Sequence, residues 1–237
     1  MPERHDQWRA GRSSGILDAG AVPPETRNRM STAREHWEAR YSDADRIWSG
    51  RPNATLVDLV GELPPASALD LGAGEGADAL WLASRGWRVT GLDLSETALG
   101  RARAAAAEQN ADMAFVQADL ADPWPIEGGF ELVTAGFLHS MVEFPRIDVL
   151  RRAAGVVVPG GHLAIVSHVA PPPWASGEEH RHGAVRLLGP EEEFEALALD
   201  PAEWLPRIVE TRERSVTAPD GGAATLLDGV LLLQRTA

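Results

Sequence analysis

The sequence ALDLGAGEGADALWLASRGWRVTGLDLSETALGRAR, residues 68–103, decides the fold of this chain. A short apolar run leads into a glycine cluster, apolar residues then recur at helical spacing, and a second apolar run, residues 87–92, closes on Asp93. The pattern predicts one strand–turn–helix–strand unit with a carboxylate, Asp70 or Asp93, near the end of each strand. Glycines allow positive φ and let a ligand lie against the backbone, where the free N–H groups of the helix start face it. We therefore expect a ligand site at this turn.

Two classes of ligand use such a turn. The glycine spacing fits a dinucleotide fingerprint, with Asp93 placed to bind a ribose hydroxyl. A pyrophosphate, however, favours a helix N-terminus without competing anions, whereas here Asp70 precedes the turn and Glu75 lies inside it. Two carboxylates repel a diphosphate but suit a ligand with an ammonium group, a sulfonium and a ribose. The residues thus favour S-adenosylmethionine over NAD(P).

The segment resembles motif I of the class I S-adenosylmethionine-dependent methyltransferases, Asp-x-Gly-x-Gly-x-Gly, with Asp93 as the acid that ends the second strand. The resemblance implies an α/β, Rossmann-like three-layer sandwich with a mostly parallel seven-stranded sheet and a C-terminal antiparallel hairpin. It also implies S-adenosyl-L-methionine as cofactor and S-adenosyl-L-homocysteine as product. The cofactor-binding residues that it places in this stretch are Asp70, Gly72, Ala73, Gly74, Gly76, Asp93, Leu94 and Ser95.

A third predicted strand, residues 114–117, also ends near a carboxylate, Asp119. In the resembling family the acid after this strand binds the adenine amino group, and its neighbour, here Leu120, meets the ring nitrogen through its backbone. From the residues alone, Asp119 could equally be a simple turn residue.

The region before the first strand carries a second resemblance. Residues 37–41 (WEARY) and 47–53 (IWSGRPN) resemble the N-terminal region of small-molecule methyltransferases of the tellurite-resistance and thiopurine type. The resemblance implies that Trp48 and Arg51 border the methionine end of the cofactor. Arg51 would pair with the cofactor carboxylate, which suits its forked guanidinium. The alternative is that the tryptophans pack a helix onto the sheet and Arg51 is a surface charge.

The fourth predicted strand, residues 130–135, is followed by Gly136, Phe137 and His139. In a class I fold this strand end points at the transferring methyl group, so Gly136 and Phe137 are predicted to contact the cofactor. A neutral imidazole accepts a proton near pH 7, which makes His139 a candidate general base, although it could instead hydrogen-bond the loop backbone. The Asn/Asp-Pro-Pro-Tyr string with which nucleic-acid amine methyltransferases hold an NH2 group does not occur here.

The composition and the positions of glycine and proline predict how the chain is organised. Residues 1–29 predict a flexible N-terminal extension, and residues 30–237 one methyltransferase domain, with a helical cap over 30–64 and a lid-like insertion over 170–190. A helix is expected to start at Ser31, a turn at 158–161, and a terminal hairpin around the Pro-Asp-Gly-Gly turn. Acids and histidines alternate at 178–182, but without a rigid element a solvated loop is favoured over a metal site.

The overall composition narrows the function. The chain has 237 residues, no cysteine and a formal net charge of −13, and its 22 basic residues are all arginine. This charge argues against nucleic acid as a partner, and the lack of a long apolar run argues against membrane insertion and a signal peptide, which favours a cytoplasmic location. The sequence leaves the oligomeric state open.

The sequence thus predicts methyl transfer from S-adenosylmethionine to a small-molecule nucleophile, a thiol, chalcogen or hydroxyl. A nucleotide-linked NAD(P) oxidoreductase and a non-catalytic S-adenosylmethionine-binding protein remain as alternatives.

Overall fold

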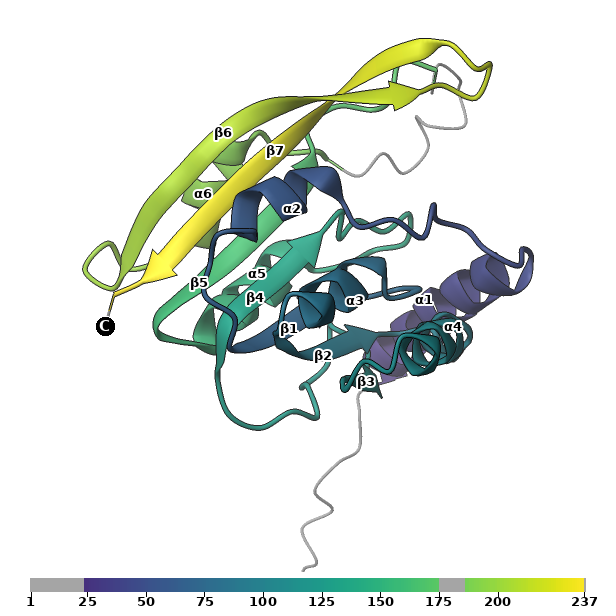
Figure 1. Cartoon of the computed structure of the whole chain (residues 1–237), viewed down its shortest axis with the longest axis horizontal. Helices are drawn as coiled ribbons and strands as arrows, with labels where there is room; N and C mark the ends of the chain where they lie inside the picture. The colour runs from purple at the N-terminus through teal and green to yellow at the C-terminus, as the bar shows by residue number, and fades with distance from the viewer. Residues whose placement is uncertain (1–23, 175–185, 237) are drawn as a thin grey trace, which may run out of the picture.

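A computed structural model describes residues 24–174 and 186–236 of the chain (Figure 1). The predicted extension, apart from its last residues, and His180 and His182 of the predicted lid lie outside this part. The helices and strands are α1 (Pro24–Ser42), α2 (Ala54–Val60), β1 (Ser67–Leu71), α3 (Ala77–Ser84), β2 (Arg88–Asp93), α4 (Glu96–Glu108), β3 (Ala114–Gln117), β4 (Phe130–Gly136), α5 (Arg146–Gly155), β5 (Val157–His168), α6 (Pro190–Leu197), β6 (Trp204–Thr217) and β7 (Ala223–Arg235).

Within the described residues the strands form one seven-stranded sheet in the order β3-β2-β1-β4-β5-β7-β6. The first five strands of this order pair in parallel, and β7 runs antiparallel to both β5 and β6. The predicted fold class, a mostly parallel sheet that ends in an antiparallel hairpin, is confirmed. The strand order reverses between β1 and β4, and in open α/β sheets ligands bind beyond the carboxyl ends of the strands at such a point.

Helices cover both faces of the sheet because its central strands are buried on both sides. Leu69 and Leu71 of β1 join a core cluster with α5 and α6, whereas Ala68 joins a second cluster with α2 and α3. This alternation follows from the period of two along a strand. The α4 helix packs against β2 and β3, and α1 lies beside α4 (Figure 1).

Two predicted boundaries differ from the structure. The first helix begins at Pro24 and not at Ser31, which agrees with the preference of proline for the first turn of a helix. The predicted turn at 158–161 lies inside β5, whose pairing with β4 shifts register between Phe130 and Leu132. Gly160 has φ 85°, so the glycine pair forms an irregularity within the strand and does not end it.

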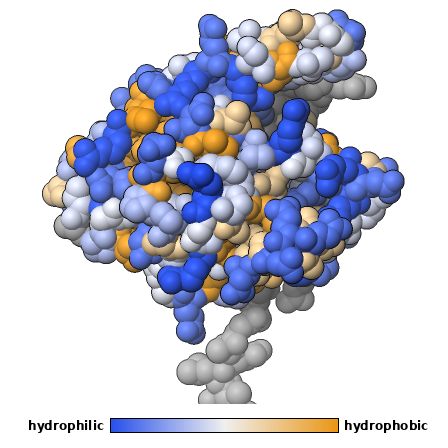
Figure 2. Space-filling view, viewed as in Figure 1, coloured by the Kyte–Doolittle hydropathy of each residue, from blue (hydrophilic) through white to orange (hydrophobic). Residues whose placement is uncertain are grey.

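The long β6–β7 hairpin stands above α2 and leaves an indentation between its tip and the lobe made by α1 and α4 (Figures 1 and 2). The face seen in Figure 2 is mostly hydrophilic, with separate hydrophobic patches. No helix among the described residues is long and apolar enough to cross a bilayer.

Candidate functional site

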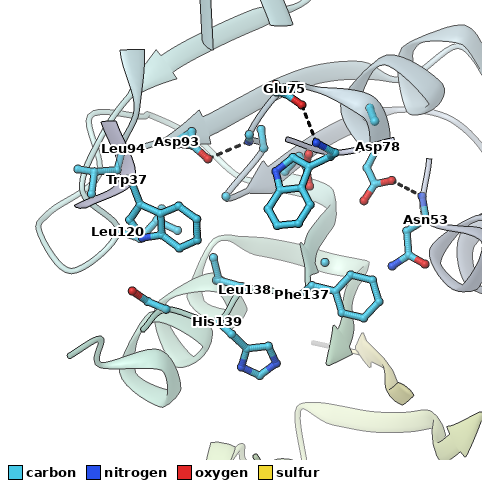
Figure 3. A pocket seen from close by; sticks show the side chains of 18 of the residues that line it. Trp37, Asn53, Glu75, Asp78, Asp93, Leu94, Leu120, Phe137, Leu138 and His139 are labelled. Carbon is cyan, nitrogen blue, oxygen red and sulfur yellow. Dashed lines mark hydrogen bonds between the residues drawn. The ribbon is translucent and has the colours of Figure 1, made fainter. Parts of the chain in front are cut away.

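A cavity of about 1290 Å³ opens at the carboxyl ends of the parallel strands. Its walls come from α1, the segment between α1 and α2, the loops after β1, β2, β3 and β4, and residues 214–217 of β6. Most of the residues predicted to form the site line this cavity (Figure 3). They are Trp48, Arg51, Asp70, Gly72, Ala73, Gly74, Asp93, Leu94, Asp119, Leu120, Gly136, Phe137 and His139.

The glycine turn after β1 takes the shape predicted for it. Gly72, Gly74 and Gly76 have φ values of 68°, 52° and 84°, which disfavour any residue with a Cβ. A Cβ on Gly74 would also lie 2.9 Å from the hydroxyl of Tyr41. The turn thus brings bare backbone to the cavity wall at the start of α3.

Asp93 braces the turn from the end of β2. One carboxylate oxygen accepts a hydrogen bond from the Gly74 N–H at 2.8 Å, and the other accepts from the Ser95 N–H at 2.9 Å (Figure 3). The side chain is buried, and burial raises its pKa against the opposing effect of these backbone hydrogen bonds. Each oxygen keeps a second lone pair with which it can accept from a ligand hydroxyl.

Asp70, which is buried, and Asp78, which is partly buried, form an acidic pair on the same wall. Burial raises the pKa of Asp70 to about 8, and the nearby carboxylate of Asp78 adds to this effect, while the Thr134 hydroxyl, which donates to Asp70 at 2.7 Å, opposes it. Burial also raises the pKa of Asp78, which accepts from the Asn53 N–H at 2.6 Å. A cation placed beside this pair would stabilise both carboxylates.

Glu75 does not act as the sequence suggested. Its carboxylate accepts from the backbone N–H groups of Ile47 and Trp48, at 3.3 and 3.1 Å, and pairs with Arg101 at 2.8 Å. Arg101 also donates to the carbonyl of Tyr41 at 2.7 Å. Arg101 therefore neutralises Glu75, which fastens the segment before α2 over the glycine turn, and the charge of Glu75 does not repel a diphosphate as the sequence suggested.

The cap residues lie at the rim of the cavity. Trp48 is 48% exposed and donates through its indole N–H to the Tyr41 hydroxyl at 3.1 Å. Arg51 is exposed, and its guanidinium has no hydrogen bond or ion pair with any residue in the described part of the chain. It thus keeps its donors for a ligand.

The loop after β3 has a mixed character. Asp119 lines the cavity and also accepts from the Ala121 N–H at 2.9 Å, so it is both a turn residue and a wall residue. Leu120 is buried and lines the cavity beside it. Trp124 packs against the hydrophobic core, and its indole N–H donates to the Leu120 carbonyl at 3.0 Å. It therefore shields the core from solvent.

His139, in the loop after β4, has little capacity to act as a base. Its Nε2 accepts from the His168 N–H at 3.2 Å, so the neutral ring carries its proton on Nδ1, which is buried without a hydrogen-bond partner. Burial, Arg146 and His168 lower the pKa of His139 to about 3. The backbone-binding alternative is what the geometry favours. Arg146 fixes the same loop by donating to the Leu138 carbonyl at 2.9 Å.

Two residues of the predicted cofactor set do not line the cavity. Gly76 is the N-cap of α3, where a Cβ would lie 2.9 Å from the Cβ of Ala102. Ser95 is fully buried and caps α4 by accepting from the Ala98 N–H at 3.1 Å. Conversely, sequence reasoning missed Asp78, whose position in the first turn of the helix after the glycines was the available signal.

No group of three or more His, Asp or Glu side chains in residues 24–174 and 186–236 is arranged to hold a metal ion.

Comparison with known proteins shows a matching domain and a shared fold. A family model described as a methyltransferase domain matches residues 68–161. The fold is shared with TehB from Haemophilus influenzae, at a TM-score of 0.62, 17% identity and coverage of 85% of this chain and 67% of that one. It is also shared with an S-adenosylmethionine-dependent methyltransferase from Mesorhizobium loti, at a TM-score of 0.54, 22% identity and coverage of 75% and 95%. Residues 68–161 therefore match a methyltransferase domain, and the chain has the fold of class I S-adenosylmethionine-dependent methyltransferases, whose cofactor is S-adenosylmethionine.

Among curated proteins, nocamycin O-methyltransferase from Saccharothrix syringae is 34% identical to this chain over 158 residues. The match covers 63% of this chain and 56% of that protein, little more than half of the relative's length.

Proposed function

We propose that this protein transfers a methyl group from S-adenosylmethionine to a hydroxyl oxygen of a small organic molecule. The observation that carries the proposal is the size and division of the cavity. Its volume of about 1290 Å³ exceeds the roughly 300–1,000 Å³ of a pocket for one small ligand, which leaves room for a cofactor and an acceptor together.

The glycine-turn side of the cavity fits S-adenosylmethionine. Asp70 and Asp78 would hold the ammonium group, Asp93 the ribose hydroxyls and Asp119 the adenine amino group. At the rim, Arg51 would pair with the cofactor carboxylate. These assignments are supported by the acids on this wall, because carboxylates accept hydrogen bonds and S-adenosylmethionine offers N–H and O–H groups.

The other side of the cavity suits a small, mostly apolar acceptor. It is lined by apolar side chains and one histidine: Phe137, Leu138, Val142, Phe144 and His168. Hydroxyl oxygen is favoured as the nucleophile because the relative from Saccharothrix syringae is an O-methyltransferase. Nucleic acid is disfavoured by the chain's formal net charge of −13.

The chain's own contribution to the reaction is mainly to position and enclose the reactants. When bound, the cofactor supplies a methyl group already activated by its positively charged sulfur. The loop of Phe137 to His139 and the cap of Trp48 would hold the acceptor in line with that group and exclude water.

Two measurements test the proposal. Thermal shift should show stabilisation by S-adenosylhomocysteine and none by NAD(P). Incubation with S-adenosylmethionine labelled in its methyl group should then label a phenol or an enol in a panel that also contains a thiol, tellurite and an oligonucleotide, as read by mass spectrometry. Label only in the thiol, the metalloid or the oligonucleotide would refute the hydroxyl assignment. Cofactor binding without any labelled product would support the non-catalytic alternative.

A further inference from the structure

A second histidine, His168, lines the same cavity at the end of β5. The antiparallel register of β5 and β7 pairs His168 with Asp228, so the two side chains lie on the same face of the sheet. Nδ1 of His168 is 3.9 Å from an Asp228 carboxylate oxygen. The imidazole is 36% exposed, whereas Asp228 is fully buried. An acceptor in the cavity can thus reach the ring but not the carboxylate.

Asp228 is held firmly in place. Arg214 donates to it through Nε at 2.6 Å and Nη2 at 3.2 Å, and the Thr55 hydroxyl donates at 3.0 Å. The ring of His168 is fixed from another side, since it stacks on Phe137 with centroids 4.2 Å apart and planes 15° apart. Both members of the pair are therefore oriented by their neighbours.

The arrangement sets which nitrogen of His168 carries the proton. A carboxylate beside Nδ1 favours the tautomer with the proton there, which leaves the lone pair on Nε2. No residue of the described chain forms a hydrogen bond with Nε2 of His168. His139 differs, because its Nε2 lone pair is occupied by the His168 N–H.

Three charged or titratable groups face His168. They are Asp228 on β7, Arg214 on β6 and His139 in the loop after β4. Burial lowers the pKa of His168, and Arg214 acts in the same direction, while Asp228 raises it; the net direction is downward. A neutral imidazole at physiological pH is the form that can accept a proton.

We propose that His168 is the general base that deprotonates the methyl acceptor, and that Asp228 positions it; this rests on the proposed hydroxyl methylation. The O–H bond of the acceptor breaks, the proton moves to Nε2, and the electron pair stays on oxygen, which attacks the methyl carbon. That carbon's bond to sulfur breaks and its electron pair remains on the sulfur. The proton then passes from Nε2 to water. The 3.9 Å separation is longer than a hydrogen bond, and we expect it to shorten in the ternary complex, as catalytic contacts commonly do.

The experiment compares His168→Asn with a matched control, His162→Asn, which changes a half-buried histidine in the middle of β5 that does not line the cavity. With a phenol that is protonated at the assay pH, His168→Asn should lower kcat by about 10²- to 10⁴-fold. With a nitrophenol already ionised at that pH, the loss should be less than about tenfold, because no proton has to move. S-adenosylhomocysteine affinity by calorimetry should be unchanged in both variants, and His162→Asn should keep its kcat.

A second readout needs no turnover. An NMR titration of the imidazole in the ligand-free protein should place the pKa of His168 below its ordinary value, and Asp228→Asn should lower it further. Equal loss of kcat with both phenols would indicate a packing role and overturn the proposal, as would a wild-type His168 that is protonated at pH 7. If the wild type binds S-adenosylhomocysteine but methylates no hydroxyl, the proposed function fails and this inference with it. If hydroxyl methylation persists undiminished in His168→Asn, only the inference fails.

Discussion

Asp70→Asn should stabilise the ligand-free protein, and the gain should grow with pH. Burial raises the pKa of Asp70 from its ordinary 3.8 to about 8, so the folded protein holds this proton more tightly than the unfolded chain does. Such a group favours folding most below pH 3.8, and that contribution is lost as the pH rises to about 8. Asparagine keeps an oxygen that can accept from Thr134 and carries no titrating charge.

The size of the effect follows from the shift. At about 1.4 kcal/mol per pKa unit, a carboxyl moved from 3.8 to about 8 loses at most about 6 kcal/mol of stability above pH 8. Asp70 lines the cavity, and relaxation of a buried site around a charge reduces such a penalty, so we expect about 3 kcal/mol, or a melting temperature about 6–12 °C above that of the wild type.

Thermal and urea unfolding of the ligand-free protein, at several values between about pH 5 and pH 9, measures this difference. Asp112→Asn, which removes an exposed carboxylate, serves as the control and should show no such trend. The reasoning is refuted if the difference between Asp70→Asn and the wild type does not grow as the pH rises to 8. The same variant should bind S-adenosylhomocysteine more weakly, because it removes a proposed partner of the ammonium group.

Three further changes test other parts of the site. Arg101→Met leaves Glu75 without its cation, so we expect the free energy of unfolding to fall by about 2 kcal/mol and proteolytic cleavage between α1 and α2 to become faster. An unchanged cleavage rate would show that the cap does not depend on this pair. Ser95→Ala removes the N-cap of α4, which should lower the free energy of unfolding in urea by about 1 kcal/mol and leave S-adenosylhomocysteine affinity unchanged. A loss of affinity would instead indicate that Ser95 contacts the cofactor. Arg214→Met leaves the fully buried Asp228 without its cation, which should destabilise the protein by about 3–5 kcal/mol. The double variant with Asp228→Asn should recover part of this stability. No recovery would indicate that Arg214 acts through packing alone.

The local sequence was sufficient to predict the cofactor half of the molecule. The signals were local: the glycines Gly72 and Gly74, strands that end near acids, and Ser95 as the N-cap of a helix. The structure has the turn, the strands and the capped helix where the sequence predicted them. Parallel strands with helical crossovers bring their carboxyl ends to one edge. The gathering of Asp70, Asp93 and Asp119 in one cavity therefore followed from the order of the elements.

The roles of single side chains depended on contacts between distant parts of the chain. Glu75 reads as a free anion in the turn, but the fold places Arg101 and the backbone of the cap against it. The sequence predicts His139 as a candidate base, but in the fold the backbone N–H of His168, at the end of β5, donates to its ring.

His168 and Asp228 lie 60 positions apart in the sequence and become neighbours only through the antiparallel pairing of β5 with β7. A shift of one residue in that pairing would turn the two side chains to opposite faces of the sheet. The sequence by itself determined the glycine turn and its acids because their geometry is local. Only the tertiary structure decided which charges are neutralised and which histidine keeps a free lone pair, because hydrogen bonds and ion pairs depend on distances that the register of the sheet fixes.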